Sequence, residues 1–318
     1  MSAVVASRIK VMRLMVTPNA IVNVSSVPQR SPFRYPGGKT WLIPLIRRWL
    51  QSLQPRQRHL LEPFAGGGIV GLTAAFEGLV DTVTLVELDD DVTAVWRTIL
   101  SPNAPQLAEA VLSFDFSPQA VEQVLSTPPE TLQDQAFRTL LVNRVHYGGI
   151  IAPGASPVKF GENGKGIASR WYPRTLYRRI LAIAAIRDRM RFIHGDGLDL
   201  MQAYADDTAT VCFIDPPYTV AGRRLYKHSD IDHDGLFRLA DRMVGDFLIT
   251  YDNTLEIRGL AERHGMYTEL VPMKTTKHEC MMELLIGRKL DWARAGSALQ
   301  FGENPLLKDL ETDGHTRS

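Results

Sequence analysis

The feature that most constrains the fold of this chain is an uninterrupted succession of strand, glycine-rich loop and helix. The apolar pair Leu60-Leu61 leads into the loop over 62–68, and residues 69–76 carry apolar side chains at helical spacing. A second strand over 83–86 ends at Glu87, and a helix over 91–100 follows it. This succession predicts parallel strands joined by right-handed crossovers.

The alternation stops near residue 100 and resumes near residue 191. The intervening part has helical periodicity over about 105–125, 130–145 and 174–189, with a loop rich in glycine and proline over 148–166. Later strands are expected over 191–194, 211–214, 247–250, 267–271 and 282–286, and a helix over 255–264 that Gly265 ends. The last two strands are close in sequence, which suggests an antiparallel pair at one edge of the sheet.

We therefore predict an α/β fold in which a Rossmann-like sheet is split by a mostly helical insertion. The sheet domain is expected over 30–100 and 191–290, and the insertion over 101–190. Residues 1–29 are expected to form a loosely ordered extension and residues 291–318 a tail.

Composition limits the class of protein. With 318 residues and 45% hydrophobic side chains, the chain can bury a sizeable core. Its two cysteines, Cys212 and Cys280, lack CxxC spacing, which argues against a zinc ribbon or a disulfide framework. No apolar run approaches the ~20 residues that span a bilayer. We expect a cytoplasmic protein with no metal and no membrane partner, and the sequence does not indicate an oligomeric state.

Basic residues are concentrated in two segments, although the net charge is only +1. Residues 30–59 contain seven Arg or Lys and no acid, and residues 138–191 contain eleven against Glu162 and Asp188. Residues 101–137, between them, carry five acids and no base. Separate basic segments suit contact with a phosphate backbone, and solvated helix faces are the alternative interpretation.

The segment Asp215-Pro216-Pro217-Tyr218 directly follows an apolar strand. Two prolines donate no backbone hydrogen bonds, so they end the strand and leave its last carbonyls available. The corner thus presents a carboxylate, carbonyl oxygens and an aromatic ring to one small volume. A planar heterocycle with an exocyclic amine fits there, with its amine on Asp215 and its ring on Tyr218. A simple strand-to-loop junction is the alternative.

The glycine loop indicates an adenosine-bearing cofactor. Residues 66–71 match GxGxxG, and Glu87 ends the next strand, where an acid can accept from ribose hydroxyls. Glu62 would repel a pyrophosphate but attract a sulfonium or ammonium group, so S-adenosylmethionine is favoured over NAD. Tyr35 and Lys39 flank another glycine turn and could reach one ligand. A P-loop is excluded there, because Phe33 stands where that motif needs glycine.

In this order, the motifs Tyr35-Pro-Gly-Gly-Lys39, Glu62-Pro-Phe-Ala-Gly-Gly-Gly68, Glu87 and Asp215-Pro-Pro-Tyr218 resemble those of the Dam-like DNA adenine methyltransferases. The resemblance covers about residues 31–288. It implies an S-adenosylmethionine-dependent methyltransferase sheet with a target-recognition insertion. The residues it implies for the cofactor are Tyr35, Lys39, Phe64, Gly66, Gly68, Glu87, Asp196 and Asp215, and those it implies for the target amine are Asp215, Pro216 and Tyr218.

The resemblance also implies that double-stranded DNA is the substrate and that a flipped adenine receives the methyl group on its 6-amino nitrogen. Candidate DNA-binding residues are the pair Asn143-Arg144, which matches a family motif, and Arg170, Arg174, Arg178 and Arg179 in the basic insertion. The insertion departs from Dam at residues 148–154 and 169–173, so no target sequence carries over, and a restriction endonuclease partner is left open. The alternatives are methylation of RNA adenine or a protein amide, and a catalytically silent DNA-binding relative.

Overall fold

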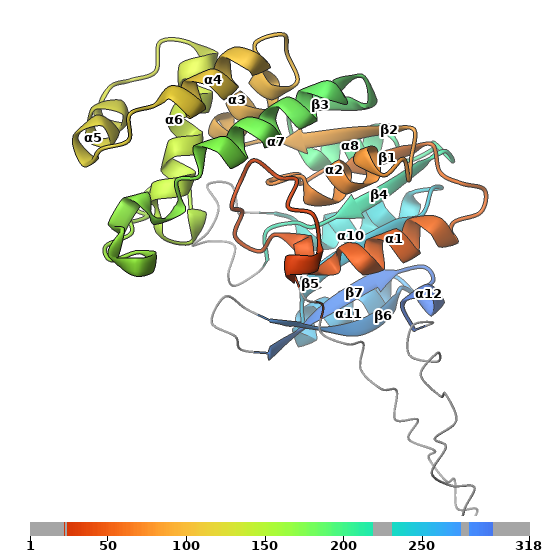
Figure 1. Ribbon diagram of the computed structural model, residues 1–318. Helices are drawn as coiled ribbons and strands as arrows, with labels where there is room; N and C mark the ends of the chain where they lie inside the picture. The colour runs from red at the N-terminus through yellow and green to blue at the C-terminus, as the bar shows by residue number, and fades with distance from the viewer. Residues whose placement is uncertain (1–21, 23, 219–230, 275–279, 295–318) are drawn as a thin grey trace, which may run out of the picture.

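The computed structural model describes residues 22, 24–218, 231–274 and 280–294, and a seven-stranded sheet forms its centre (Figure 1). The strands are β1 (His59–Glu62), β2 (Thr82–Glu87), β3 (Met190–His194), β4 (Thr210–Ile214), β5 (Phe247–Asp252), β6 (Tyr267–Lys274) and β7 (Cys280–Gly287). Their order across the sheet is β3-β2-β1-β4-β5-β7-β6.

The pairing of the strands confirms the predicted fold class. Strands β1 to β5 run parallel, and β7 lies antiparallel between β5 and β6. The antiparallel pair at one edge was expected, but the sequence did not indicate that β7 also pairs with β5. That second pairing brings β7 next to the carboxyl-terminal half of β5.

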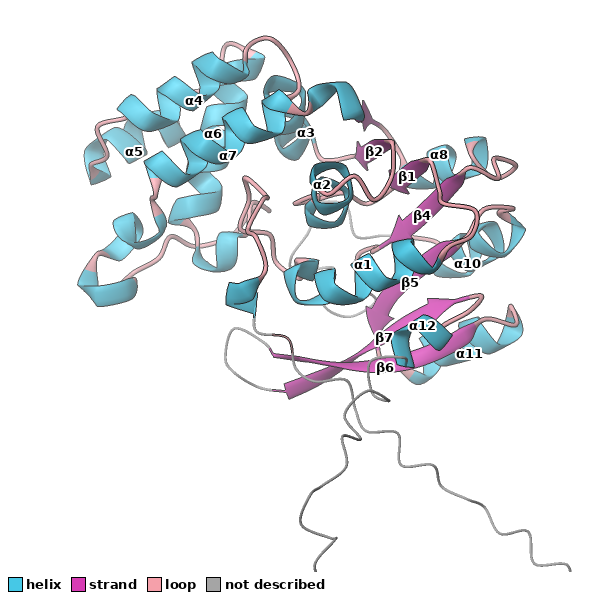
Figure 2. Ribbon diagram, turned by 45° about the vertical axis from the view of Figure 1, so that its right-hand side comes forward, coloured by secondary structure: helices cyan, strands magenta, loops and turns pink. Residues whose placement is uncertain are grey.

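Helices cover both faces of the sheet (Figure 2). One face carries α1 (Ile43–Ser52), α2 (Ile69–Phe76) and α3 (Asp90–Ile99), and the other carries α8 (Gly197–Ala203), α10 (His233–Arg242) and α11 (Leu255–Arg263). Successive strand side chains alternate between these layers: Leu60 packs in the first and Leu61 in the second. Burial on both faces explains why the central strands read as continuous apolar runs.

The insertion consists of α4 (Ala104–Ser113), α5 (Pro118–Ser126), α6 (Leu132–Val145) and α7 (Pro173–Ala185), with short 3-10 turns between α6 and α7. Helix α6 packs on α3, and α4 packs on α7. Buried side chains of α4, α6 and α7 belong to the same apolar cluster as α1, α2 and α3. The insertion therefore extends one helical layer of the sheet domain, and its status as a separate domain stays a prediction.

The helix predicted over 105–125 is wrong in one respect, because the structure has two helices there. Ser117 has extended backbone and its hydroxyl accepts from the Ala120 N–H, which begins a new helix with Pro118 in its first turn. In the break, Phe114 and Phe116 turn inward and pack on Trp171 at ring-centroid distances of 5.8 and 5.4 Å. Burial of these two rings explains why the chain leaves the helical path.

The predicted ends of the chain lie mostly outside the described residues, namely 1–21, 23 and 295–318. Val27, within the expected extension, is buried. The expected tail begins with a helix, α12 (Asp291–Arg294), which contacts α1 and buries Ala293, so its first turn is structured. No helix in the described part of the chain combines the length and apolarity needed to cross a bilayer.

Candidate active site

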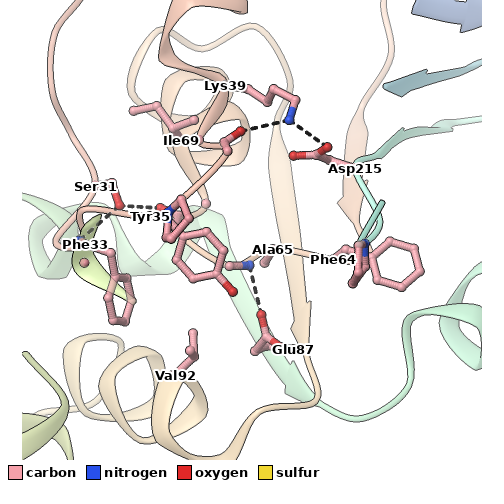
Figure 3. A pocket seen from close by; sticks show the side chains of 18 of the residues that line it. Ser31, Phe33, Tyr35, Lys39, Phe64, Ala65, Ile69, Glu87, Val92 and Asp215 are labelled. Atoms are coloured by element: carbon pink, nitrogen blue, oxygen red, sulfur yellow. Dashed lines mark hydrogen bonds and ion pairs between the residues drawn. The ribbon is translucent and has the colours of Figure 1, made fainter. Parts of the chain in front are cut away.

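A pocket of about 1450 Å³ opens where the strand order reverses, between the carboxyl ends of β1 and β4. The connection from β1 leads to β2 on one side, and the connection from β4 leads to β5 on the other. In open α/β sheets a crevice forms at the point where the connections diverge in this way. Its walls come from the segment over 31–39, the glycine loop, the ends of β2 and β4, and the insertion. Figure 3 shows Glu87 and Asp215 reaching this pocket from different strands.

The glycine loop is shaped by close contact with the segment before α1. Gly66 and Gly68 have φ of 45° and 59°, a region that glycine adopts without strain. A Cβ atom on Gly66 would lie 2.5 Å from the Tyr35 ring. The Ser31 hydroxyl donates to the Gly67 carbonyl (2.6 Å), and Trp96 Nε1 donates to the Gly66 carbonyl (2.9 Å). The loop backbone and the Tyr35 ring therefore form one rigid wall of the pocket.

Glu87 ends β2 and is fixed by three backbone groups. The Gly66 N–H donates to its Oε2 (2.9 Å), and the Leu88 and Asp89 N–H groups donate to Oε1 (2.9 and 3.1 Å). Burial raises the pKa of Glu87, while these hydrogen bonds oppose the rise. The predicted ribose acid is thus a preoriented acceptor beside the glycine loop.

Glu62 is a buried carboxylate at the end of β1. Its Oε2 accepts from the Gly71 N–H at 2.7 Å. Burial raises its pKa to about 8, the Gly71 hydrogen bond opposes that rise, and the nearby charge of Asp215 adds to it. A positively charged ligand in the pocket would offset the effects of burial and of the Asp215 charge on Glu62. The acidic side chains of the pocket therefore fit a cationic cofactor such as S-adenosylmethionine.

The Asp215 corner has the rigidity that its sequence indicates. Thr250 Oγ1 donates to Asp215 Oδ1 at 2.8 Å, and Lys39 Nζ lies 2.8 Å from the same oxygen. Tyr218 also reaches Oδ1, at 3.3 Å. The donors Thr250 and Lys39 meet on Oδ1, which orients the carboxylate and makes Oδ2 the oxygen suited to a ligand. Pro216 is buried, and Pro217 is the proline that lines the pocket.

Lys39 lies between two carboxylates. Besides Asp215, its Nζ contacts Glu283 Oε1 at 3.3 Å and the Gly37 carbonyl at 2.8 Å. Tyr218 donates to Glu283 Oε1 at 2.5 Å, a distance typical of a hydroxyl bound to a carboxylate. Sequence reasoning assigned Lys39 to the cofactor and missed both Glu283 and Thr250. An acid inside the apolar run over 281–286 was the available signal for Glu283.

Phe64 and Asp196 both line the pocket, as predicted positions around the cofactor should. Asp196 also has a structural task, because its Oδ1 accepts from the Leu198 N–H (2.8 Å) and caps α8. The helix cap gives Asp196 a structural role, and its contact with a cofactor adenine stays a prediction. The described residues contain no cluster of His, Cys, Asp or Glu suited to a metal ion.

The prediction that Asn143 binds DNA is wrong for this conformation. Its side chain is fully buried, accepts from the Arg34 N–H (2.8 Å) and donates to the carbonyls of Arg34 (3.0 Å) and Gly149 (2.7 Å). Arg144 is also buried, and its Nη2 donates to the Pro32 carbonyl (2.6 Å). Both side chains instead brace the segment over 32–34, which carries the wall of the pocket.

The other insertion arginines differ in placement. Arg174 and Arg178 are exposed on α7, whereas Arg179 is partly buried, lines the pocket and donates to the Ser31 carbonyl (3.0 Å). Arg170 lies at the end of a 3-10 turn over 166–170. Burial, with the charges of Arg179 and Arg34, lowers the pKa of Arg144 to about 9. This wall therefore has an excess of positive charge.

Four arginines of the first basic segment form ion pairs within the protein. Arg30 and Arg47 pair with Glu77 at 3.0 and 2.7 Å, and Arg56 and Arg58 pair with Asp81 at 2.7 and 3.4 Å. These pairs reduce the positive charge of the segment without removing it, and Arg56 and Arg58 stay largely exposed, so phosphate binding by residues 30–59 stays a prediction. Their partners, in the turn between α2 and β2, lie too far along the sequence for a charge run to reveal them.

Comparison with known proteins places this arrangement in a family. Residues 35–269, which include the glycine loop and the Asp215 corner, match the D12 class of N6 adenine-specific DNA methyltransferases. The chain belongs to this D12 class. A curated relative, the DNA N-6-adenine-methyltransferase of Escherichia phage P1, is 26% identical to this D12-class chain over 257 residues. That match covers 76% of the chain and 32% of the relative, so the chain spans about a third of the relative's length.

Solved structures with a similar fold are more distant from this D12-class chain. A putative RNA methyltransferase from Pyrococcus horikoshii is 10% identical with a TM-score of 0.38, over 83% of this chain and 92% of that one. A precorrin-6y C5,15-methyltransferase from Geobacter metallireducens is 12% identical with a TM-score of 0.34, over 77% and 85%. The methyl donor of a D12-class methyltransferase is S-adenosylmethionine.

Proposed function

We propose that this chain transfers a methyl group from S-adenosylmethionine to the 6-amino nitrogen of an adenine in double-stranded DNA, after the base has left the helix. The observation that carries the proposal is the single pocket that joins the glycine loop and Glu87 to the Asp215 corner. Membership of the D12 class supports the same reaction. The phage relative is named for adenine methylation of DNA.

In this proposal the cofactor occupies the side of the pocket formed by β1 and β2. Glu87 accepts from ribose hydroxyls, the backbone of Gly66 and Gly68 allows close approach, and Tyr35 packs against the ligand. A bound sulfonium would lower the raised pKa of Glu62, so that Glu62 supplies negative charge close to the cationic part. When bound, S-adenosylmethionine supplies a methyl group whose bond to sulfur breaks as the amine nitrogen attacks.

The target amine occupies the Asp215 corner. Asp215 Oδ2 accepts one N–H of the amine, while Oδ1 is held by Thr250 and Lys39. This contact turns the nitrogen lone pair away from the purine ring, and the carboxylate is the acceptor for the proton that the amine loses. A hydrogen bond to a charged acceptor is worth about 1.5–3 kcal/mol, which corresponds to one or two decades of rate.

Base flipping is part of the proposal, because an adenine amine that is paired within a duplex is out of reach of a side chain such as Asp215. Flipping costs a few kcal/mol, and stacking on an aromatic ring returns about 1–3 kcal/mol. The Tyr218 ring lines the pocket, where Tyr251 stacks on it at a centroid distance of 5.5 Å and Lys39 Nζ lies 5.1 Å from its centroid. Tyr218 is therefore the stacking partner that we assign to the target base.

We assign DNA phosphate binding to the insertion wall formed by Arg174, Arg178 and Arg179. Arg179 extends this positive surface into the pocket. The neighbouring positive charge that lowers the pKa of Arg144 would be offset by a phosphate at this wall. Arg170 lies shortly before α7 in the sequence, and its contact with DNA stays a prediction from the sequence.

Transfer of labelled methyl groups to duplex DNA, RNA and protein tests the proposed reaction, and methylation confined to RNA or protein would contradict it. DNA affinity should fall steeply between 50 and 200 mM salt. Replacing exposed Arg178 with Gln should reduce the slope of log affinity against log salt by about 1. Arg58→Gln is the control, because that guanidinium already pairs with Asp81. Equal slopes for the two variants would contradict the assigned wall.

Sequencing methylated genomic DNA from cells that express the chain would identify the target sequence. An endonuclease that cuts the same unmethylated sequence would indicate a restriction–modification role, and its absence from the host would indicate a solitary methyltransferase.

A further inference from the structure

Glu283 lies beside Asp215 in the wall of the pocket, but the contacts proposed for DNA and for the cofactor do not include it. It is on β7, where it pairs in register with Asp252 of β5 and Val271 of β6. Only 5% of its surface is exposed. An acid in the middle of a buried strand is costly unless its charge is paired or hydrogen-bonded. Its partners therefore indicate its role.

Both partners of Glu283 are parts of the Asp215 corner. Its Oε1 contacts Lys39 Nζ at 3.3 Å and accepts from the Tyr218 hydroxyl at 2.5 Å. The same Tyr218 hydroxyl is 3.3 Å from Asp215 Oδ1, and its single proton goes to the closer acceptor. Glu283 thus fixes the position of the tyrosine ring and competes with Asp215 for the lysine.

The competition changes how much charge Asp215 offers to a ligand. One ammonium is shared between two carboxylates, so Asp215 keeps part of its negative charge unneutralised. If Glu283 were neutral, Lys39 would pair with Asp215 alone, and the Tyr218 proton would turn to Asp215 as well. Both changes would make Asp215 a weaker acceptor for an amine.

We propose that Glu283 is a positioning residue for methyl transfer: it holds Lys39 and the Tyr218 hydroxyl so that Asp215 keeps one oxygen and its charge for the target amine. The proposal rests on the proposed function. It requires no contact between Glu283 and the substrate, and it assigns Glu283 a task distinct from those of Glu62 and Glu87, the other two glutamates of the pocket.

The pH dependence of the reaction follows from the groups that face Glu283. These are Lys39 from the 3-10 turn over 39–42, Asp215 and Tyr218 beyond β4, and Asp252, the partner of Glu283 on β5. Burial raises the pKa of Glu283, and the charge of Asp215 adds to the rise, while Lys39 opposes it. Glu283 is active when ionised, so kcat should fall as the pH falls through this raised pKa.

The test replaces Glu283 with Gln, which keeps an acceptor for Tyr218 but removes the charge. We expect kcat to fall at least tenfold, the KM for DNA and the Kd for S-adenosylmethionine to stay within twofold, and the acid limb of the kcat profile to disappear. Glu283→Asp, which restores the charge, should recover part of kcat and the limb. Glu269→Gln is the matched control, because Glu269 lies on the adjacent strand and pairs with Arg294.

A Gln variant with wild-type kcat and an unchanged acid limb would overturn the proposal, and so would equal losses in the Gln and Asp variants. Far-ultraviolet circular dichroism verifies folding. If the Gln variant does not fold, Tyr218→Phe decides: loss of the hydroxyl that Glu283 holds should lower kcat and shift the acid limb, and an unchanged profile refutes the role. Absence of methyl transfer by the wild-type chain on any DNA would instead contradict the proposed function.

Discussion

Replacement of Asp215 with Ala separates its role in the reaction from its role in the fold. The change removes the acceptor of the target amine and leaves the glycine loop, Glu87 and Tyr35 in place. A lost hydrogen bond to a charged acceptor costs about 1.5–3 kcal/mol, or roughly 10- to 150-fold in rate. An amine displaced by about 1 Å can lose another 10²-fold. We expect kcat to fall by about 10³-fold or more.

The same replacement should leave stability nearly unchanged. In the wild type, one ammonium serves two carboxylates, so removing Asp215 leaves a balanced pair of Lys39 and Glu283. The free energy of unfolding should change by no more than about 1 kcal/mol. Lys39→Met has the opposite effect, since it leaves two carboxylates without their cation and should destabilise the fold by about 3–5 kcal/mol.

Three measurements decide the matter: single-turnover transfer of labelled methyl groups to duplex DNA, calorimetric binding of S-adenosylmethionine, and urea unfolding. The reasoning is refuted if the Ala variant transfers methyl groups at the wild-type rate. It is also refuted if that variant unfolds as easily as Lys39→Met, because the charge balance described above would then not exist.

Two further changes test the bracing and the buried charge. Asn143→Ala should lower the free energy of unfolding by about 3 kcal/mol in urea, because three hydrogen bonds to backbone groups are lost. The salt dependence of its DNA affinity, measured by fluorescence anisotropy, should stay unchanged. A weaker salt dependence would instead place Asn143 at the DNA interface. Because the pKa of Glu62 is raised to about 8, the stability of the wild type should decline as pH rises from about 4.5 to 8. Thermal unfolding of Glu62→Gln between those pH values should lack this decline. A parallel decline in both proteins would contradict the raised pKa of Glu62.

The chemistry of the site was predictable wherever one short segment determines it. The glycine loop, Glu87 and the Asp215 corner each follow a strand, and parallel strands end at one edge of a sheet, so these residues had to meet. Thr250 was missed because its approach to Asp215 depends on β5 pairing with β4, and Glu283 was missed because its approach depends on β7 pairing with β5; no local pattern encodes either neighbour.

Charge patterns in the sequence were a poorer guide than motifs. A run of arginines does not show which of them face solvent, and four arginines of the first run pair with Glu77 and Asp81. Asn143 illustrates the same limit: its place in a motif indicated importance, and only its three backbone partners show that the importance is structural.

The hydrogen bonds of Asn143 limit which parts of the insertion can be exchanged between related proteins. They join the end of α6 to the backbone of Arg34, and Gly149 must remain glycine there, since its φ is 77° and a Cβ would lie 2.2 Å from the Arg34 carbonyl oxygen. A chimera that replaces residues 150–165 keeps this junction intact. One that also replaces residues 143–149 must import the matching segment over 31–34.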